Sequence, residues 1–263
     1  MKKYEQFVCL SGLPRSGSTL LSAILSQNPK IHAEGNSAVC QLMWDMQHSC
    51  LNRCNEQLNA NNRKRTIKEL LKSIPAVYYN DIDENEKIIV DKCRSWTVID
   101  NIELLKENID KNIKIIMLER PILEIINSFH RLFIKNYRLN DLNMLLVHDS
   151  EPVMRPLNGL IYAKQNNQSN NFLFITYKEL TKNTEKTIKK IYDFCNWEYF
   201  EHDFNNILPK YAENDEEYGL EGFHDVYPSI RNVKNEIILP EDIKEKCIEF
   251  DDILMNVNFM YKN

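Results

Sequence analysis

The segment Phe7–Leu21, with the sequence FVCLSGLPRSGSTLL, carries residue types that bind a phosphate or a similar anion. Its glycines, Gly12 and Gly17, have the spacing of a Walker loop, but Ser18 follows where that loop has lysine. The cation is Arg15 instead. Further hydrogen-bond donors are the hydroxyl side chains of Ser16, Ser18 and Thr19. The loop is therefore typical of an anion site that differs from the usual site for nucleoside triphosphates.

A second segment, Lys114–Phe133, places a cation and a hydroxyl near another strand end. An apolar strand over Ile115–Leu118 delivers Arg120 at its carboxyl end, and Pro121 then opens a helix at the position that proline favours. Ser128 follows Arg120 by eight positions, which is about two helical turns. We therefore expect Arg120 and Ser128 to bind one further phosphate.

These residues need a scaffold, and the order of the predicted elements indicates a parallel sheet with helices on both faces. The strands are expected at Phe7–Ser11, Ile31–Ala33, Lys87–Asp91, Lys114–Glu119 and Phe172–Thr176. The helices are expected at Ser18–Gln27, Ala38–Cys54, Lys64–Lys72, Ser95–Asn108, Ile122–Asn136, Val153–Asn167, Thr184–Cys195 and Pro240–Met255, with a loop or connection at Asn55–Arg65. Ligands of such sheets bind beyond the carboxyl ends of the strands. The sequence thus predicts a single α/β domain over residues 1–263 with a P-loop-like parallel sheet.

Composition excludes several classes of function. The chain has 263 residues, of which 43% are hydrophobic and 27% charged, as in ordinary soluble domains. A net charge of −5 disfavours broad nucleic-acid binding, and no apolar run is long enough to span a membrane. Seven cysteines without a C-x-x-C pair and the lack of a signal segment favour a cytoplasmic protein. No metal-ligand pattern stands out, and the oligomeric state stays open, a homodimer included.

The two anion motifs resemble those of the sulfotransferase family that uses 3′-phosphoadenosine 5′-phosphosulfate (PAPS). The family's 5′-phosphosulfate loop has the form seen at Pro14–Leu21, without the Walker lysine, and its 3′-phosphate motif has an arginine eight positions before a serine. The form Pro-Arg-Ser-Gly-Ser-Thr is most similar to the branch with protein-tyrosine, heparan-type and many bacterial sulfotransferases. The resemblance implies that PAPS is bound by Pro14, Arg15, Ser16, Gly17, Ser18, Thr19, Leu20, Arg120 and Ser128. It also implies sulfuryl transfer to a hydroxyl or amine with release of adenosine 3′,5′-bisphosphate (PAP).

The same resemblance suggests further positions. Tyr177, in a Tyr-x-x-Leu motif at a strand end, matches a tyrosine that lies by the adenine, and the late residues Ser229 and Arg231 are expected to contact the nucleotide. Lys92 matches a lysine that follows a strand in the protein-tyrosine branch. Together with Arg15, Lys92 would neutralise charge on the transferred group.

The sequence indicates less clearly which residue is the general base that removes the proton from the acceptor group. The protein-tyrosine branch has its catalytic glutamate in the segment that matches residues 31–37, and the ungapped match falls on Asn36. Glu34, two residues earlier, is the predicted base, and His32 and His224 are the alternatives.

Residues 210–233 form the longest stretch without clear periodicity, and we expect a lid over the site there. Two other functions stay open: an atypical P-loop kinase for small molecules, which would turn over ATP with Mg²⁺, and a non-catalytic nucleotide-binding module. The sequence does not identify the acceptor, for which a small alcohol or phenol, a sugar, a lipid and a peptide are all open.

Overall fold

The computed structural model of the protein describes residues 4–138, 142–148, 150–166, 170–231 and 236–260. The last residue of the predicted helix Val153–Asn167 lies outside the described residues, as do residues 232 and 233 of the predicted lid.

Five parallel strands form the central sheet in the order β2-β3-β1-β4-β5. Their bounds are β1 (Gln6–Gly12), β2 (Ile31–His32), β3 (Ile88–Lys92), β4 (Lys114–Glu119) and β5 (Phe172–Thr176). Each strand agrees with its prediction to within one residue at either end, so the α/β fold class is confirmed. Since β1 lies between β3 and β4, the loop that follows Gly12 emerges at the middle of the carboxyl edge.

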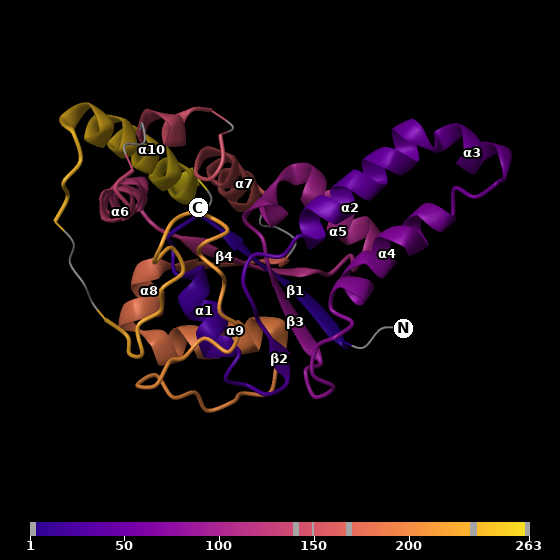
Figure 1. Ribbon diagram of the computed structural model, residues 1–263, viewed down its shortest axis with the longest axis horizontal. Helices are drawn as coiled ribbons and strands as arrows, with labels where there is room; N and C mark the ends of the chain where they lie inside the picture. The colour runs from indigo at the N-terminus through magenta and orange to yellow at the C-terminus, as the bar shows by residue number, and fades with distance from the viewer. Residues whose placement is uncertain (1–3, 139–141, 149, 167–169, 232–235, 261–263) are drawn as a thin grey trace.

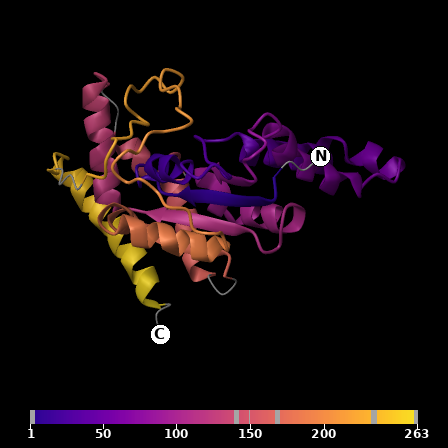
Figure 2. The same cartoon turned by 90° about the horizontal axis from the view of Figure 1, so that it is seen from below.

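Both faces of the sheet are buried, because successive residues of a strand point to opposite sides. In β1, Phe7 and Cys9 belong to one apolar cluster, whereas Val8 and Leu10 belong to the other. The second cluster is covered by α1 (Ser18–Leu25), α8 (Tyr177–Lys182) and α9 (Thr184–Cys195). The first is covered by α2 (Val39–His48), α4 (Thr66–Tyr78), α5 (Ile99–Asn108), α6 (Ile122–Lys135), α7 (Met154–Gln165) and α10 (Glu241–Met260). Figures 1 and 2 show the sheet between these layers.

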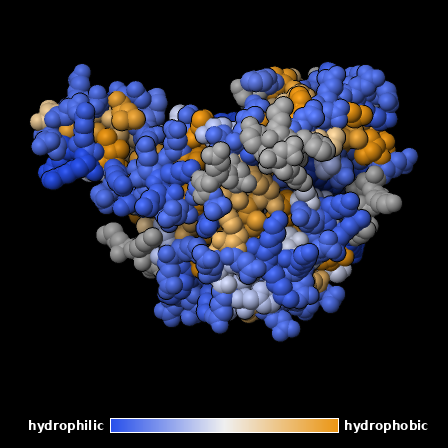
Figure 3. All heavy atoms as spheres, turned by 180° about the vertical axis from the view of Figure 1, so that it is seen from behind, coloured by the Kyte–Doolittle hydropathy of each residue, from blue (hydrophilic) through white to orange (hydrophobic). Residues whose placement is uncertain are grey.

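A helical arm projects from the body beyond the amino-terminal end of β1 (Figures 1 and 2). It consists of α2, a π-helical turn at Ser49–Arg53, α3 (Asn55–Ala60) and α4. The predicted loop at Asn55–Arg65 is therefore wrong over Asn55–Ala60, where Glu, Gln, Leu and Ala favour a helix. At the left of Figure 3 the arm carries apolar side chains among hydrophilic ones. Its exposed large apolar residues are Leu42, Trp44, Leu51 and Val77.

Other elements also differ from the prediction. The helices predicted to end at Lys72 and Met255 continue to Tyr78 in α4 and to Met260 in α10. The predicted helix Ser95–Asn108 is divided by Val98, whose backbone is extended, into a 3₁₀ turn at Arg94–Thr97 and α5. A further 3₁₀ turn covers Leu142–Leu146, and α8 follows β5 directly through a capping box at Thr176. Among the described residues, no helix combines the length and apolarity needed to cross a lipid bilayer.

Candidate active site

A cavity of about 420 Å³ opens at the carboxyl edge of the sheet, a size typical of small-molecule sites. The ends of β1 and β3, the first turn of α1, the side of α6 and the segment Gly222–Arg231 form its walls. Nearly all of the predicted nucleotide-binding residues line it, namely Pro14, Arg15, Gly17, Ser18, Thr19, Leu20, Arg120, Ser128, Tyr177, Ser229 and Arg231. Ser16 is not among the described lining residues, because its fully buried hydroxyl donates a hydrogen bond to the carbonyl of Leu13.

The backbone of the first loop explains its glycines. Gly12 has a φ of +115°, and an added Cβ there would overlap with the carbonyl of Leu118 on β4. Gly17, at φ +94°, precedes α1 and lies close to the ring of Tyr177. Both conformations favour glycine, since a Cβ makes positive φ costly. The loop therefore wraps tightly and leaves the start of α1 facing the cavity, where backbone N–H groups attract anions.

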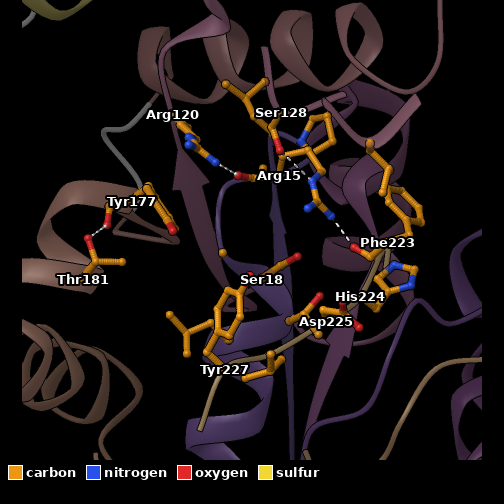
Figure 4. Close-up of a pocket in the computed structure, with 18 of the residues that line it drawn as sticks. Arg15, Ser18, Arg120, Ser128, Tyr177, Thr181, Phe223, His224, Asp225 and Tyr227 are labelled. Carbon is orange, nitrogen blue, oxygen red and sulfur yellow. Dashed lines mark hydrogen bonds between the residues drawn. The ribbon is translucent and has the colours of Figure 1, made fainter. Parts of the chain in front are cut away.

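Arg15 joins three parts of the chain in this cavity (Figure 4). Its Nε donates to the Oγ of Ser128 at 3.1 Å, and its terminal nitrogen donates to the carbonyl of Phe223. The carbonyl of Arg15 in turn accepts a hydrogen bond from Arg120 at 2.7 Å. The first loop, α6 and the segment 210–231 therefore converge on one guanidinium, and the two predicted anion motifs form one site.

Tyr177 lies at the opposite wall of the cavity from Phe223 (Figure 4). The guanidinium carbon of Arg120 is 4.3 Å from the centre of the Tyr177 ring, within the range of a cation–π contact. On the late segment, the guanidinium of Arg231 is 4.2 Å from the ring centre of Tyr227. Each contact pairs a flat aromatic ring with a cation at the cavity, which suits a planar anionic ligand.

Lys92 ends β3 with its side chain almost fully buried, and its Nζ is 2.7 Å from Oε2 of Glu213. Burial lowers the pKa of Lys92, and the negative charge of Glu213 opposes that effect. Conversely, burial disfavours the charged form of Glu213, but the ammonium of Lys92 holds its pKa below the usual value. Because Lys92 also lines the cavity, the structure keeps a paired ammonium at the cavity wall.

His224 lines the same wall and pairs with Asp215. Its Nδ1 is 2.7 Å from Oδ1 of Asp215, and its backbone N–H donates to the same carboxylate at 3.2 Å. Burial lowers the pKa of His224, although the two nearby carboxylates of Glu213 and Asp215 oppose this. Since a carboxylate only accepts hydrogen bonds, the contact with Asp215 favours the neutral tautomer with the proton on Nδ1. The other ring nitrogen, Nε2, lies 3.5 Å from Oε1 of Glu213.

Glu34, the predicted base, does not appear among the described residues that line the cavity. Its carboxylate lies 3.2 Å from Nε2 of His32, whose Nδ1 lies 2.9 Å from the buried carboxylate of Glu86. Two carboxylates around one imidazole raise the pKa of His32, although burial opposes the shift. Glu34 and His32 therefore pair with each other, and neither is among the described residues that line the main cavity.

Sequence reasoning missed Glu213, Asp215 and Phe223, all of which belong to the segment 210–231. There was little indication of the Asp215–His224 pair in the sequence, because a spacing of nine positions matches neither the helical nor the strand period. The partner relationships arise only when this segment folds back onto the ends of β1 and β3. Among the residues that the structure describes, no group of three or more His, Cys, Asp or Glu side chains is placed to hold a metal ion.

The parallel sheet, the glycine loop at its middle strand and the helix after it define a P-loop-like α/β protein. The profile of the sulfotransferase family matches residues 8–201, and the chain belongs to that family. No curated protein sequence matches it significantly.

Solved structures share the fold. The sulfotransferase domain of the Synechococcus PCC 7002 olefin synthase has a TM-score of 0.58 at 17% identity, over 97% of this chain and 96% of that one. The sulfotransferase domain from the curacin biosynthetic pathway has a TM-score of 0.52 at 17% identity, over 96% and 97%. A sulfotransferase from Alicyclobacillus acidocaldarius has a TM-score of 0.52 at 12% identity, over 97% and 93%.

Proposed function

We propose that the protein transfers a sulfuryl group from PAPS to a hydroxyl or amine of an acceptor and releases PAP. Membership of the sulfotransferase family supports the reaction class. The observation that carries the proposal is the convergence of Arg15, Arg120 and Ser128 in one cavity. This arrangement offers two anion sites at the carboxyl edge of one sheet, as a donor with phosphate groups at two positions requires.

Each part of the donor has a partner in this proposal. The loop from Pro14 to Leu20, with the start of α1, would hold the phosphosulfate, because Ser18 and Thr19 line the cavity at the amino-terminal end of a helix. Arg120 and Ser128 would hold the 3′-phosphate. Tyr177 would stack on the adenine, and Ser229 and Arg231 would close over the nucleotide from the late segment.

The chemistry then needs charge neutralisation and a base. Arg15 and Lys92 would neutralise the oxygens of the transferred group and of the leaving phosphate. We assign the base to His224 in preference to Glu34, since His224 lines the cavity and its contact with Asp215 favours the tautomer whose Nε2 carries the lone pair. Asp215 would also stabilise the imidazolium after His224 takes the proton of the acceptor.

The segment 210–231 supports a single functional domain, because it supplies a wall of the cavity that the sheet builds. We therefore propose that residues 1–263 act as one unit. Any change in the position of the segment on donor binding stays a prediction.

Calorimetry with PAP tests the donor site. We expect binding in the micromolar range to folded wild-type protein, and no binding at millimolar PAP would contradict the proposal. Transfer of labelled sulfate from PAPS to phenols, sugars and peptides then separates the enzyme from a non-catalytic binding module. Mg²⁺-dependent ATP turnover without PAP binding would favour the kinase instead.

A further inference from the structure

Glu213 is a buried carboxylate that contacts three elements of the candidate site. Its side chain is 10% exposed, and Oε2 accepts a hydrogen bond from Nζ of Lys92 at 2.7 Å. Its other oxygen, Oε1, accepts the backbone N–H of Asn36 at 3.0 Å and lies 3.5 Å from Nε2 of His224. One carboxylate therefore stands between the ammonium and the imidazole that the proposed reaction uses.

Because Glu213 and Lys92 are both buried, the loss of either charge would be costly. A carboxylate and an ammonium that are both largely removed from water depend on each other, so loss of one leaves an uncompensated charge. The side chain of Lys92 is only 4% exposed, and no other carboxylate lies within ion-pair distance of it among the described residues. Glu213 thus determines where the Lys92 ammonium rests at the cavity wall.

Asn36 reinforces this placement. It stands at the ungapped match to the catalytic glutamate of the protein-tyrosine branch. Its backbone forms a parallel β-bridge with Lys92. Its backbone N–H and its side-chain amide both donate hydrogen bonds to Oε1 of Glu213, at 3.0 and 3.3 Å. A carboxylate therefore reaches this region from a segment that lies 177 residues later in the chain. The segment 210–231 is anchored at the same point.

We propose that Glu213 is a positioning residue for sulfuryl transfer, which holds the Lys92 ammonium at the cavity and orients His224 from the side opposite Asp215. The inference rests on the proposed function. Glu213 itself does not touch the reacting atoms, because it is not among the described residues that line the main cavity. It acts through its two partners and links the late segment to the end of β3.

The electrostatic consequence is specific. Glu213 favours the charged forms of both His224 and Lys92, so its removal would lower the pKa of each. The other charged groups that face this pair are Asp215 beside His224, and Arg94 and Glu34 near Lys92.

The first test needs neither donor nor acceptor. The titration of the His224 imidazole is followed by NMR in the wild type and in Glu213→Gln, which keeps the side-chain volume. We expect the midpoint to move to lower pH by about one unit or more in the variant. Glu216→Gln, an exposed neighbour, is the control and should leave the midpoint unchanged. An unchanged midpoint in Glu213→Gln would overturn the coupling, whether or not the protein binds PAP.

The second test is kinetic. In Glu213→Gln we expect kcat to fall by about 10- to 100-fold, because small misplacements of reacting groups are costly, with the KM for PAPS nearly unchanged. Both limbs of the pH–rate profile should shift to lower pH. Glu213→Asp keeps the charge and shortens its reach, so it should restore most of the NMR midpoint but not kcat. A kcat at the wild-type level in both folded variants would overturn the proposal.

If Glu213→Gln does not fold, Glu213→Asp and Asn36→Ala carry the kinetic test. Asn36→Ala removes the side-chain amide bond to Glu213 but keeps the backbone N–H bond. It should lower kcat less than Glu213→Asp does. Wild-type kcat in both would again overturn the proposal. Absent PAP binding by the wild type would instead contradict the proposed function, and the NMR test would still decide the coupling.

Discussion

The guanidinium of Arg15 donates a hydrogen bond to the hydroxyl of Ser128 at 3.1 Å, although the two residues are 113 positions apart. Arg15 follows the central strand, and Ser128 lies in the second turn of the helix after β4. Their contact joins the two anion motifs into one site. Substitution of Arg15 therefore tests catalysis, and substitution of Ser128 tests binding of the nucleotide.

Arg15→Ala should lower kcat by about 10²–10³, because in the proposed reaction this cation faces the developing charge. The variant should keep its fold, as circular dichroism and thermal melting would show. Arg65→Ala, which removes an exposed cation on the distant arm, is the matched control and should leave kcat unchanged. A rate for Arg15→Ala close to that of the control would contradict the role of Arg15.

Ser128→Ala should weaken PAP binding by about 10- to 100-fold, the amount that one hydrogen bond to a charged partner contributes. Adenosine 5′-monophosphate lacks the 3′-phosphate, so calorimetry should show equal affinity of the wild type and the variant for it. A similar loss for both nucleotides would mean that Ser128 does not contact the 3′-phosphate.

Gly12→Ala should destabilise the fold by about 2 kcal/mol or more, because the new methyl group meets the backbone of β4 at an unfavourable φ. Gly219→Ala is the matched control. Its φ is also positive, at +59°, but the methyl group meets only the far end of the Arg138 side chain. We expect a loss of about 1 kcal/mol there by urea unfolding. Equal losses would show that the close approach to β4 has no cost.

Asp251→Ala should lower the free energy of unfolding by about 1–2 kcal/mol through loss of a helix cap. The carboxylate of Asp251, on α10, accepts the backbone N–H groups of Ile122 and Leu123 at 2.6 and 3.2 Å, where α6 begins. Asp252→Ala changes the exposed neighbour and should cost less than about 0.5 kcal/mol. Equal costs in urea unfolding would exclude the cap.

His202 should make stability depend on pH between about 4 and 6.5. Burial lowers its pKa to about 4, and Nε2 lies 2.9 Å from the hydroxyl of Tyr192. Between these values the unfolded chain binds a proton that the folded protein does not, so protonation favours unfolding as pH falls. The stability difference between the wild type and His202→Gln should therefore shrink from pH 7 to pH 4.5. The exposed His48→Gln should show no such trend, and a constant difference for His202→Gln would contradict the shift.

Local patterns of the sequence alone determined the sheet and both anion motifs. Apart from β2, which is only Ile31–His32, each strand contains a short apolar run. The Gly12–Gly17 loop and the Arg120–Ser128 spacing are contained within single strand–helix units. Such features depend on neighbours in the chain, so composition and period reveal them. The boundaries within the arm were harder to predict, since exposed polar residues there fit a loop as well as a helix.

Only the tertiary structure decided which residues of the late segment join the candidate site. Residues 210–231 have no helical or strand period, so their path depends on long-range contacts that a linear pattern does not contain. Those contacts bring Glu213 to Lys92 and the His224–Asp215 pair to the cavity. They leave Glu34 paired with His32, although Glu34 is nearer to the first loop in the sequence. The sequence therefore indicated which motifs gather at the carboxyl edge of the sheet. The fold of the late segment decided which imidazole lines the cavity and which carboxylates pair with it and with Lys92.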